Sequence, residues 1–194
     1  MKQVLQTLRT IVARAEQTHA GLYFSLWTDP AVMANVGFPG GIPITMDEIE
    51  TRIAGEPDSD LDRLLVVILR KTGEPIGECY MHPPDGEGTA STDLKLLPAF
   101  QGMGLGTEVK LALLDFLFTG TDCARVQATP NRGNTASIRM QEKAGGVRTG
   151  EGVSRFPETM AEYTSPVRYF TYIVSRETWI RNRQKDQVDP GNKW

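Results

Sequence analysis

The sequence predicts a single α+β domain with a mixed, mostly antiparallel central sheet flanked by helices. Three successive strand patterns between residues 64 and 98 predict an antiparallel meander. A strongly apolar helix pattern over residues 107–118 and a strand pattern over 124–129 follow, an order typical of a parallel strand–helix–strand unit. The sequence has no repeats, low-complexity segments or internal linkers. We therefore expect one domain over residues 1–183 and a polar, disordered tail over residues 184–194.

The first part of the chain predicts one strand and two helices. Residues 8–15 alternate roughly, as in a short strand, and residues 20–27 carry apolar side chains at helical spacing. Asp29 followed by Pro30 is a helix start, with the aspartate as N-cap and the proline in the first turn. Prolines and glycines then predict a loop over residues 36–44.

Another helix and the meander come next. Thr45 and Glu48 form a T-x-x-E capping box, which starts a helix. After an acidic loop, the apolar runs at residues 64–69, 74–81 and 90–98 are predicted to be the three meander strands.

The last third of the chain predicts one more helix and two closing strands. The helix covers residues 135–144 and ends at Gly145 and Gly146, since glycine favours the position after a helix. Residues 147–153 and 167–175 have the composition of strands.

Composition narrows the class of function. The chain has 194 residues, 40% hydrophobic and 23% charged, which suffices for a core. A net charge of −3 argues against a partner bound through nucleic-acid phosphates. Two cysteines and no signal-peptide pattern favour a cytoplasmic protein, and no apolar run is long enough for a membrane span. Two histidines far apart in the sequence and two isolated cysteines predict no metal site.

Three glycines at alternate positions precede the apolar helix: Gly102, Gly104 and Gly106. They are either a flexible turn or a stretch of bare backbone N–H groups that an anion can approach at a helix N-terminus. Gly106 is followed by Thr107 and Glu108, which excludes the G-K-[ST] ending of a nucleotide phosphate loop. The spacing also differs from the G-x-G-x-x-G dinucleotide motif.

The segment from Gln101 to Gly106 reads Q-x-x-G-x-G and resembles the pyrophosphate-binding signature of the GNAT superfamily of acetyl-CoA-dependent N-acetyltransferases. "NTASIRMQEKAGG", residues 134–146, is similar to a segment of the ribosomal-protein N-terminal acetyltransferase branch, as is "LWTDPAVMANVGFP". The resemblance covers residues 9–175. Two positions depart from the branch: Gly146 replaces an aromatic residue, and Ser91 lies where an acidic residue is usual.

The resemblance implies acetyl-CoA as cosubstrate. Gln101 would be a neutral donor to the pyrophosphate, the strand end at Leu96 and Leu97 would pair with the pantetheine amides, and Asn134 would bond the pantetheine arm. The backbone N–H groups expected at the pyrophosphate are those of Gly102, Met103, Gly104, Leu105, Gly106 and Thr107.

The resemblance also implies that Ser137 lies nearest the thioester sulfur, where its hydroxyl can donate to the departing thiolate. Asp93 is our candidate for the general base, because it lies in the strand that leads to the cofactor site. Plain alternatives stay open: Asn134 as a helix N-cap, Ser137 as a first-turn polar residue and Asp93 as a solvated carboxylate. Glu78 is a weaker candidate for the base, and we interpret His82 as a turn residue.

The amine acceptor is expected between the early helices. Phe38 and Ile42 are candidate walls, with Trp27 nearby, or else these residues pack their own loop. Arg139 and Lys143 are candidates for the 3′-phosphate, together with Arg132, or else a solvated helix face.

Two functions therefore compete. The first is an N-acetyltransferase acting on the primary amine of a protein N-terminus or of a small molecule such as a polyamine, an aminoglycoside or an amino-acid-like metabolite. The second is a non-catalytic acyl-CoA-binding or sensing domain. We expect neither a nucleic-acid nor a membrane partner, and a homodimer is plausible by analogy.

Overall fold

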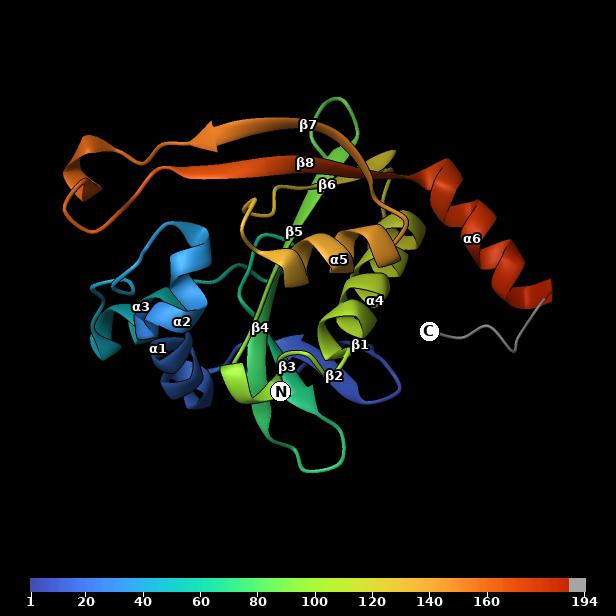
Figure 1. Ribbon diagram of the computed structural model, residues 1–194. Coiled ribbons are helices and arrows are strands. Elements are labelled where there is room, and N and C mark those ends of the chain that lie inside the picture. Colours follow the sequence, from blue (N-terminus) through green and yellow to red (C-terminus); the bar gives the residue numbers. More distant parts are fainter. Residues whose placement is uncertain (189–194) are drawn as a thin grey trace.

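The computed structural model describes residues 1–188, which form one eight-stranded sheet with helices on both faces (Figure 1). The strands are β1 (Gln3–Gln6), β2 (Thr10–Arg14), β3 (Leu65–Leu69), β4 (Pro75–His82), β5 (Thr89–Leu96), β6 (Arg125–Ala128), β7 (Val147–Ser154) and β8 (Val167–Ser175). The helices are α1 (Ala20–Thr28), α2 (Pro30–Met33), α3 (Met46–Ala54), α4 (Leu105–Gly120), α5 (Thr135–Lys143) and α6 (Arg176–Val188). The predicted α+β fold is confirmed.

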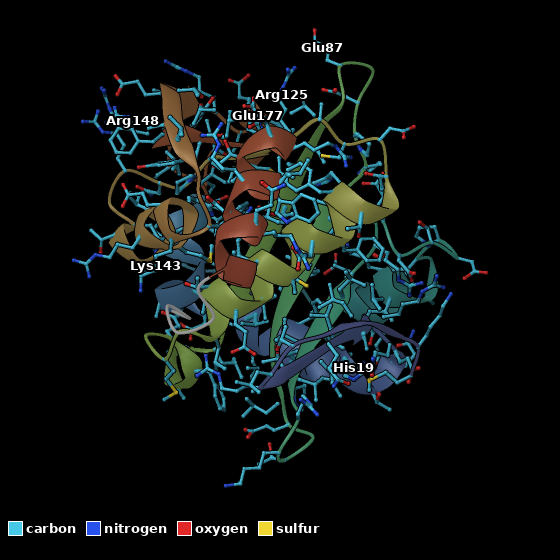
Figure 2. The ribbon with its side chains drawn as sticks, turned by 90° about the vertical axis from the view of Figure 1, so that its right-hand side faces the viewer. His19, Glu87, Arg125, Lys143, Arg148 and Glu177 are labelled. Carbon is cyan, nitrogen blue, oxygen red and sulfur yellow. The ribbon has the colours of Figure 1, made fainter. Side chains whose placement is uncertain are left out.

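The sheet has the order β1-β2-β3-β4-β5-β6-β8-β7, and within residues 1–188 β5 and β6 are its one parallel pair of neighbours. Those two strands pair only over Thr89–Ser91 and Arg125–Gln127 and then separate. Arg125 fixes the paired end, because its guanidinium bonds Thr89 Oγ1 at 2.7 Å and Glu87 at 2.9 Å (Figure 2). One edge of β5 is therefore left without a neighbouring strand beyond this point, between α4 and α5.

Each face of the sheet carries its own core. Helix α4 packs Val109, Leu113 and Leu117, all fully buried, against one face. Helices α1 and α3 cover the other face with Tyr23, Leu26 and Ile49 (Figure 1). Strand β3 is buried on both faces because its residues alternate between the two cores.

The predicted helix ends are confirmed. Asp29 caps α2 by accepting from the Ala31 N–H at 2.8 Å, with Pro30 in the first turn. Thr45 and Glu48 form the reciprocal capping box of α3. Gly145 follows α5 with φ +83°, in the left-handed region that favours glycine.

Two elements were not predicted. Strand β1 is short and half-exposed, so its sequence shows little hydrophobic pattern. Helix α6 runs through residue 188, into the segment expected to be a tail. Polar side chains such as Arg, Gln and Lys are good helix formers, so polarity alone did not indicate disorder. Residues 189–194 lie outside the described residues.

The β7–β8 hairpin reaches across to the α1–α3 layer (Figure 1). Phe156, beyond the end of β7, packs edge-on against Phe38 with ring centroids 5.2 Å apart, and Ser165 N–H donates to the Gly37 carbonyl at 2.9 Å. The hairpin thus supports the loop that follows α2. Within the described residues, no helix combines the length and apolar character that crossing a membrane would need.

Candidate active site

The N-terminus of α4 offers a row of free backbone donors. Gly102 and Gly104 adopt φ of +74° and +77°, a conformation that L side chains rarely adopt. Among the described residues, no acceptor is bonded to any backbone N–H from Gly102 to Thr107. Met103 is exposed and Leu105 buried, so each offers this site its backbone rather than its side chain. Six consecutive free donors at the positive end of a long helix are an arrangement that an anion can approach.

Arg9 brings a positive charge to this loop from the β1–β2 turn. Its Nη1 donates to the Met103 carbonyl at 2.9 Å, and its Nε pairs with Glu108 at 2.7 Å. A Cβ added at Gly104 would lie 3.4 Å from Arg9 Nη2. The guanidinium therefore holds the loop in place, while Glu108 balances its positive charge.

The free edge of β5 runs from this loop toward the paired end of the strand. Leu97 N–H donates to the Ile76 carbonyl of β4 at 2.9 Å, so the alternation of an antiparallel ladder directs the backbone groups of Leu94 and Leu96 to the other edge. Gln101 Nε2 occupies the Leu96 carbonyl at 2.8 Å. Leu97 therefore cannot offer its N–H to a ligand, whereas Leu94, which sequence reasoning missed, can.

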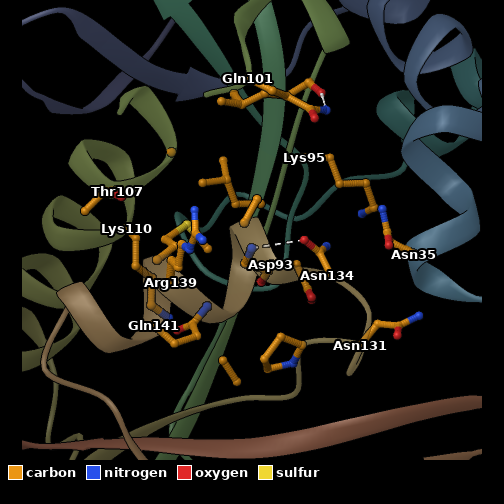
Figure 3. A pocket seen from close by; sticks show the side chains of 18 of the residues that line it. Asn35, Asp93, Lys95, Gln101, Thr107, Lys110, Asn131, Asn134, Arg139 and Gln141 are labelled. Atoms are coloured by element: carbon orange, nitrogen blue, oxygen red, sulfur yellow. Dashed lines mark hydrogen bonds between the residues drawn. The ribbon is translucent and has the colours of Figure 1, made fainter. Parts of the chain in front are cut away.

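A cavity of about 450 Å³ opens beside this edge (Figure 3). Its walls come from α2 and the turn after it, from β5, from the first turns of α4, from the end of β6 and from α5. Gln101, the three glycines, Thr107, Leu96, Asn134, Ser137 and Asp93 all line it. The chain thus brings together residues between positions 31 and 143 around one hollow.

Asn134 is the N-cap of α5. Its Oδ1 accepts from the Ser137 N–H at 3.0 Å, which is the plain alternative left open by the sequence, and its Nδ2 has no acceptor among the described residues (Figure 3). The Ser137 hydroxyl likewise donates to no described group and lines the cavity. Both side chains keep a donor available to a ligand.

The Asp93 side chain lies on the face of β5 away from α4, because side chains alternate along a strand and its neighbour Thr92 contacts α4. There it is one of three ionisable groups that lie close together. His82 Nε2 lies 3.8 Å from the Asp93 carboxylate, and His82 Nδ1 lies 3.0 Å from Asp62. The nearby His82 imidazole lowers the pKa of Asp93, and the two carboxylates raise the pKa of His82. His82, which we interpreted as a turn residue, is the last residue of β4 and is paired with Asp93.

The comparisons with known proteins agree with this geometry. Residues 9–147 match the family model "Acetyltransferase (GNAT) domain". The chain belongs to the GNAT acetyltransferase family. Its sequence is 36% identical over 124 residues to an aminoglycoside N(6′)-acetyltransferase type 1 of Serratia marcescens, covering 58% of this chain and 57% of that protein. The chain thus spans little more than half the length of this curated relative.

Solved GNAT structures share the fold. A spermidine N-acetyltransferase from Vibrio cholerae, in complex with CoA and spermine, superposes with a TM-score of 0.74 at 16% identity over 88% of this chain and 98% of that one. An aminoglycoside acetyltransferase in complex with coenzyme A and kanamycin gives a TM-score of 0.68 at 17% identity, over 90% and 99% of the two chains.

The expected acceptor walls lie elsewhere in this GNAT domain. Trp27 and Phe38 are buried, at 5% and 8% exposure, and neither they nor Ile42 line the cavity. All three belong to the core of the α1–α3 face or pack against it, as in the plain alternative. Trp27 Nε1 donates to buried Glu78 at 2.9 Å, and Lys95 pairs with Glu78 at 2.6 Å. Lys95 therefore already balances the charge of the Glu78 carboxylate.

Basic residues line the cavity from the helices. Arg139 and Lys143 of α5 line it, whereas Arg132 lies over the Phe170 ring, 5.2 Å from its centroid. Lys110 of α4 also lines the cavity and is fully buried. Sequence reasoning missed Lys110, although a lysine on the apolar side of a helix was a visible signal.

Proposed function

We propose that this GNAT chain transfers the acetyl group of acetyl-CoA directly to a primary amine of a small molecule. One observation carries the proposal: a row of free N–H groups at the N-terminus of α4 continues into the unpaired edge of β5 and opens into a single cavity. Acetyl-CoA has three parts in the same order: a diphosphate for the N–H groups, an arm with two amides for the strand edge, and a thioester for the cavity.

The residues fit coenzyme A part by part. The N–H groups of residues 102–107 suit the pyrophosphate, since backbone N–H groups and the helix dipole both favour anions. Arg9 fixes the shape of this loop by donating to the Met103 carbonyl. Leu94 and Leu96 offer strand-like hydrogen bonds to the pantetheine amides, and Asn134 Nδ2 offers another from α5.

The transfer needs a neutral amine, a path for its proton and a stabilised thiolate. The amine attacks the thioester carbonyl carbon, a C–N bond forms and the C–S bond breaks, releasing CoA. We assign the donor beside the sulfur to the Ser137 hydroxyl. Asp93 receives the amine proton and relays it to His82, whose raised pKa makes it the better holder of a proton.

A cationic acceptor fits the charges on the amine side. Asp93 is 63% exposed and Asp62 52% exposed, and both carboxylates lie beside His82. The relatives named above act on aminoglycosides and on spermidine, which carry several amines. We therefore place an aminoglycoside or a polyamine ahead of a protein N-terminus as the acceptor.

An amine panel tests the proposal. Purified protein with acetyl-CoA is expected to release CoA thiol with kanamycin or spermidine and to release little with an N-terminal peptide. Saturating CoA, at about 100 times its Kd, is expected to stabilise the fold by about 2.7 kcal/mol and so to raise the melting temperature. A raised melting temperature without thiol release from any amine supports the acyl-CoA sensor instead. If CoA does not raise the melting temperature and no amine causes thiol release, both functions are contradicted.

A further inference from the structure

Lys110 is a charged side chain buried in the candidate site without a charged partner. It is 1% exposed, and its Nζ donates to Thr92 Oγ1 at 2.6 Å. An ammonium group has three donors, and among the described residues Thr92 is its one acceptor and no carboxylate oxygen lies within 4.0 Å. Burying an uncompensated cation costs several kcal/mol of folding free energy. A buried lysine at this place in the cavity therefore suggests a functional role.

The position of Lys110 along the cavity is fixed by the packing of α4 on β5. A Cβ at Gly106 would meet the Leu94 side chain at 3.6 Å and that of Leu96 at 3.8 Å. Lys110 is the next residue along that face of the helix, and it bonds Thr92, further along β5. Thr92 directly follows the last residue of β5 that pairs with β6. The ammonium group therefore lies at the inner end of the cavity, where the two strands separate.

Under the proposed function, the sulfur of coenzyme A is the atom that reaches the inner end of the cavity. A coenzyme whose pyrophosphate lies on residues 102–107 and whose arm follows Leu96 and Leu94 brings its sulfur toward Thr92, about 13 Å along β5 from Leu96 at 3.3 Å per residue. Resting on that function, we propose that the Lys110 ammonium is the general acid that protonates the departing sulfur of coenzyme A.

Every proton in this step has a donor and an acceptor. The amine nitrogen forms the C–N bond to the acetyl carbon, the C–S bond breaks, and its electron pair stays on sulfur. The proton of Lys110 Nζ moves to that sulfur, giving CoA thiol and a neutral lysine. The new amide nitrogen loses its proton to Asp93 and His82, and water returns a proton to the neutral lysine.

The other side chains at this end are poor acids. Ser137 and Thr92 carry hydroxyls and Gln141 an amide, and none of these groups gives up a proton near neutral pH. They can stabilise a thiolate by hydrogen bonding but cannot convert it to a thiol. Burial, by contrast, lowers the pKa of Lys110 to about 8, close to the value of about 8.5 of a free thiol. A matched donor transfers its proton without a large barrier.

The charges around Lys110 come from three elements. Asp93 on β5 acts to raise its pKa, and His82 on β4 stands behind Asp93. Arg139 and Lys143 of α5 line the same cavity. In the dependence of kcat on pH, the fall at acid pH reflects protonation of the acceptor amine and of the Asp93–His82 pair. The fall at alkaline pH reflects loss of the proton from Lys110.

Replacing the lysine separates acid catalysis from binding. Lys110→Met keeps the side-chain length without a proton, and Lys110→Arg keeps the charge but holds its proton too tightly. For both variants we expect kcat to fall at least about 100-fold, the usual scale of general-acid catalysis, while the Kd for CoA changes less than about threefold. Lys71→Met, an exposed change in the β3–β4 turn, is the matched control and is expected to leave kcat unchanged.

A selenoester analogue of acetyl-CoA supplies a readout that a structural role would not move, because a selenolate leaves without needing a proton. We expect it to restore most of the lost rate in both variants. In the unmodified protein, kcat with the thioester is expected to fall above about pH 8, while kcat with the selenoester does not. This second measurement needs no variant to fold.

Lys110 is excluded as the acid if Lys110→Met keeps kcat within about threefold of the unmodified protein, or if the selenoester speeds variants and unmodified protein equally. An unmodified protein that releases no CoA thiol with any amine would instead contradict the proposed function, and this inference with it.

Discussion

At the scale of single residues, Asn134 divides its two polar atoms between fold and ligand. Its Oδ1 caps α5, and its Nδ2, which has no acceptor among the described residues, is proposed to bond the pantetheine arm. Serine caps a helix about as well as asparagine but has no amide donor. Asn134→Ser is therefore expected to keep the melting temperature and to weaken CoA binding about tenfold by calorimetry. Asn134→Ala, which loses the cap as well, is expected to cost about 1 kcal/mol of stability. Unchanged CoA affinity in the serine variant would leave Asn134 with the cap alone.

Ser137 is expected to act on turnover more than on binding. Its hydroxyl has no acceptor among the described residues, and the sulfur becomes negatively charged only as the C–S bond breaks. Ser137→Ala is therefore expected to lower kcat about 10- to 100-fold, the value of a hydrogen bond to a charged group, with KM for acetyl-CoA unchanged. Steady-state kinetics with the best amine of the panel measures both, and an unaltered kcat would remove this role from Ser137.

Lys110 links the site to the stability of the fold. Its pKa is lowered from 10.5 to about 8 in the folded protein, so the unfolded chain binds this proton more tightly. The contribution of Lys110 to the free energy of unfolding therefore rises with pH between these two values. Lys110→Met is expected to be more stable than the unmodified protein at pH 7, by up to about 3 kcal/mol, and to lose this advantage by pH 10. Urea unfolding at the two pH values measures the difference, and an advantage independent of pH would mean that Lys110 is not strained by burial.

At the scale of elements, the N-terminus of α4 is the feature on which binding depends. Gly104→Asp places a carboxylate where the pyrophosphate is proposed to lie, and next to Arg9. Aspartate tolerates positive φ better than most residues, so we expect the fold to survive. CoA affinity is expected to fall at least tenfold by calorimetry. Gly86→Asp adds the same charge in the open β4–β5 turn and is expected to change nothing. Equal affinity of the two variants would count against the anion site.

The elements also divide into those that the sequence could and could not predict. Caps at Asp29 and Thr45, the glycine at the end of α5 and the meander strands carry local signals, and the structure has them in place. Strand β1 is stabilised by pairing with β2, a contact that leaves little trace in its own residues. Helix α6 is fixed partly by Trp179 donating to Asp115 of α4 at 2.6 Å, a contact far along the chain.

At the scale of the whole molecule, the site is a consequence of sheet topology. Two parallel strands that part after three pairs leave an edge of β5 free, α4 brings donors to one end of it, and α5 brings Asn134 and Ser137 alongside. The sequence predicted the loop and the helix, because glycine spacing and apolar periodicity are local. It did not predict that Arg9, His82 and Lys110 would join them, since each comes to the site through packing between distant segments.

The crystal structure of the complex with coenzyme A tests this account most directly. We expect the diphosphate oxygens within hydrogen-bond distance of the backbone N–H groups between Gly102 and Thr107, with the pantetheine arm along Leu94 and Leu96. Coenzyme bound in another place, with those N–H groups left facing solvent or filled by the protein's own side chains, would contradict the central claim.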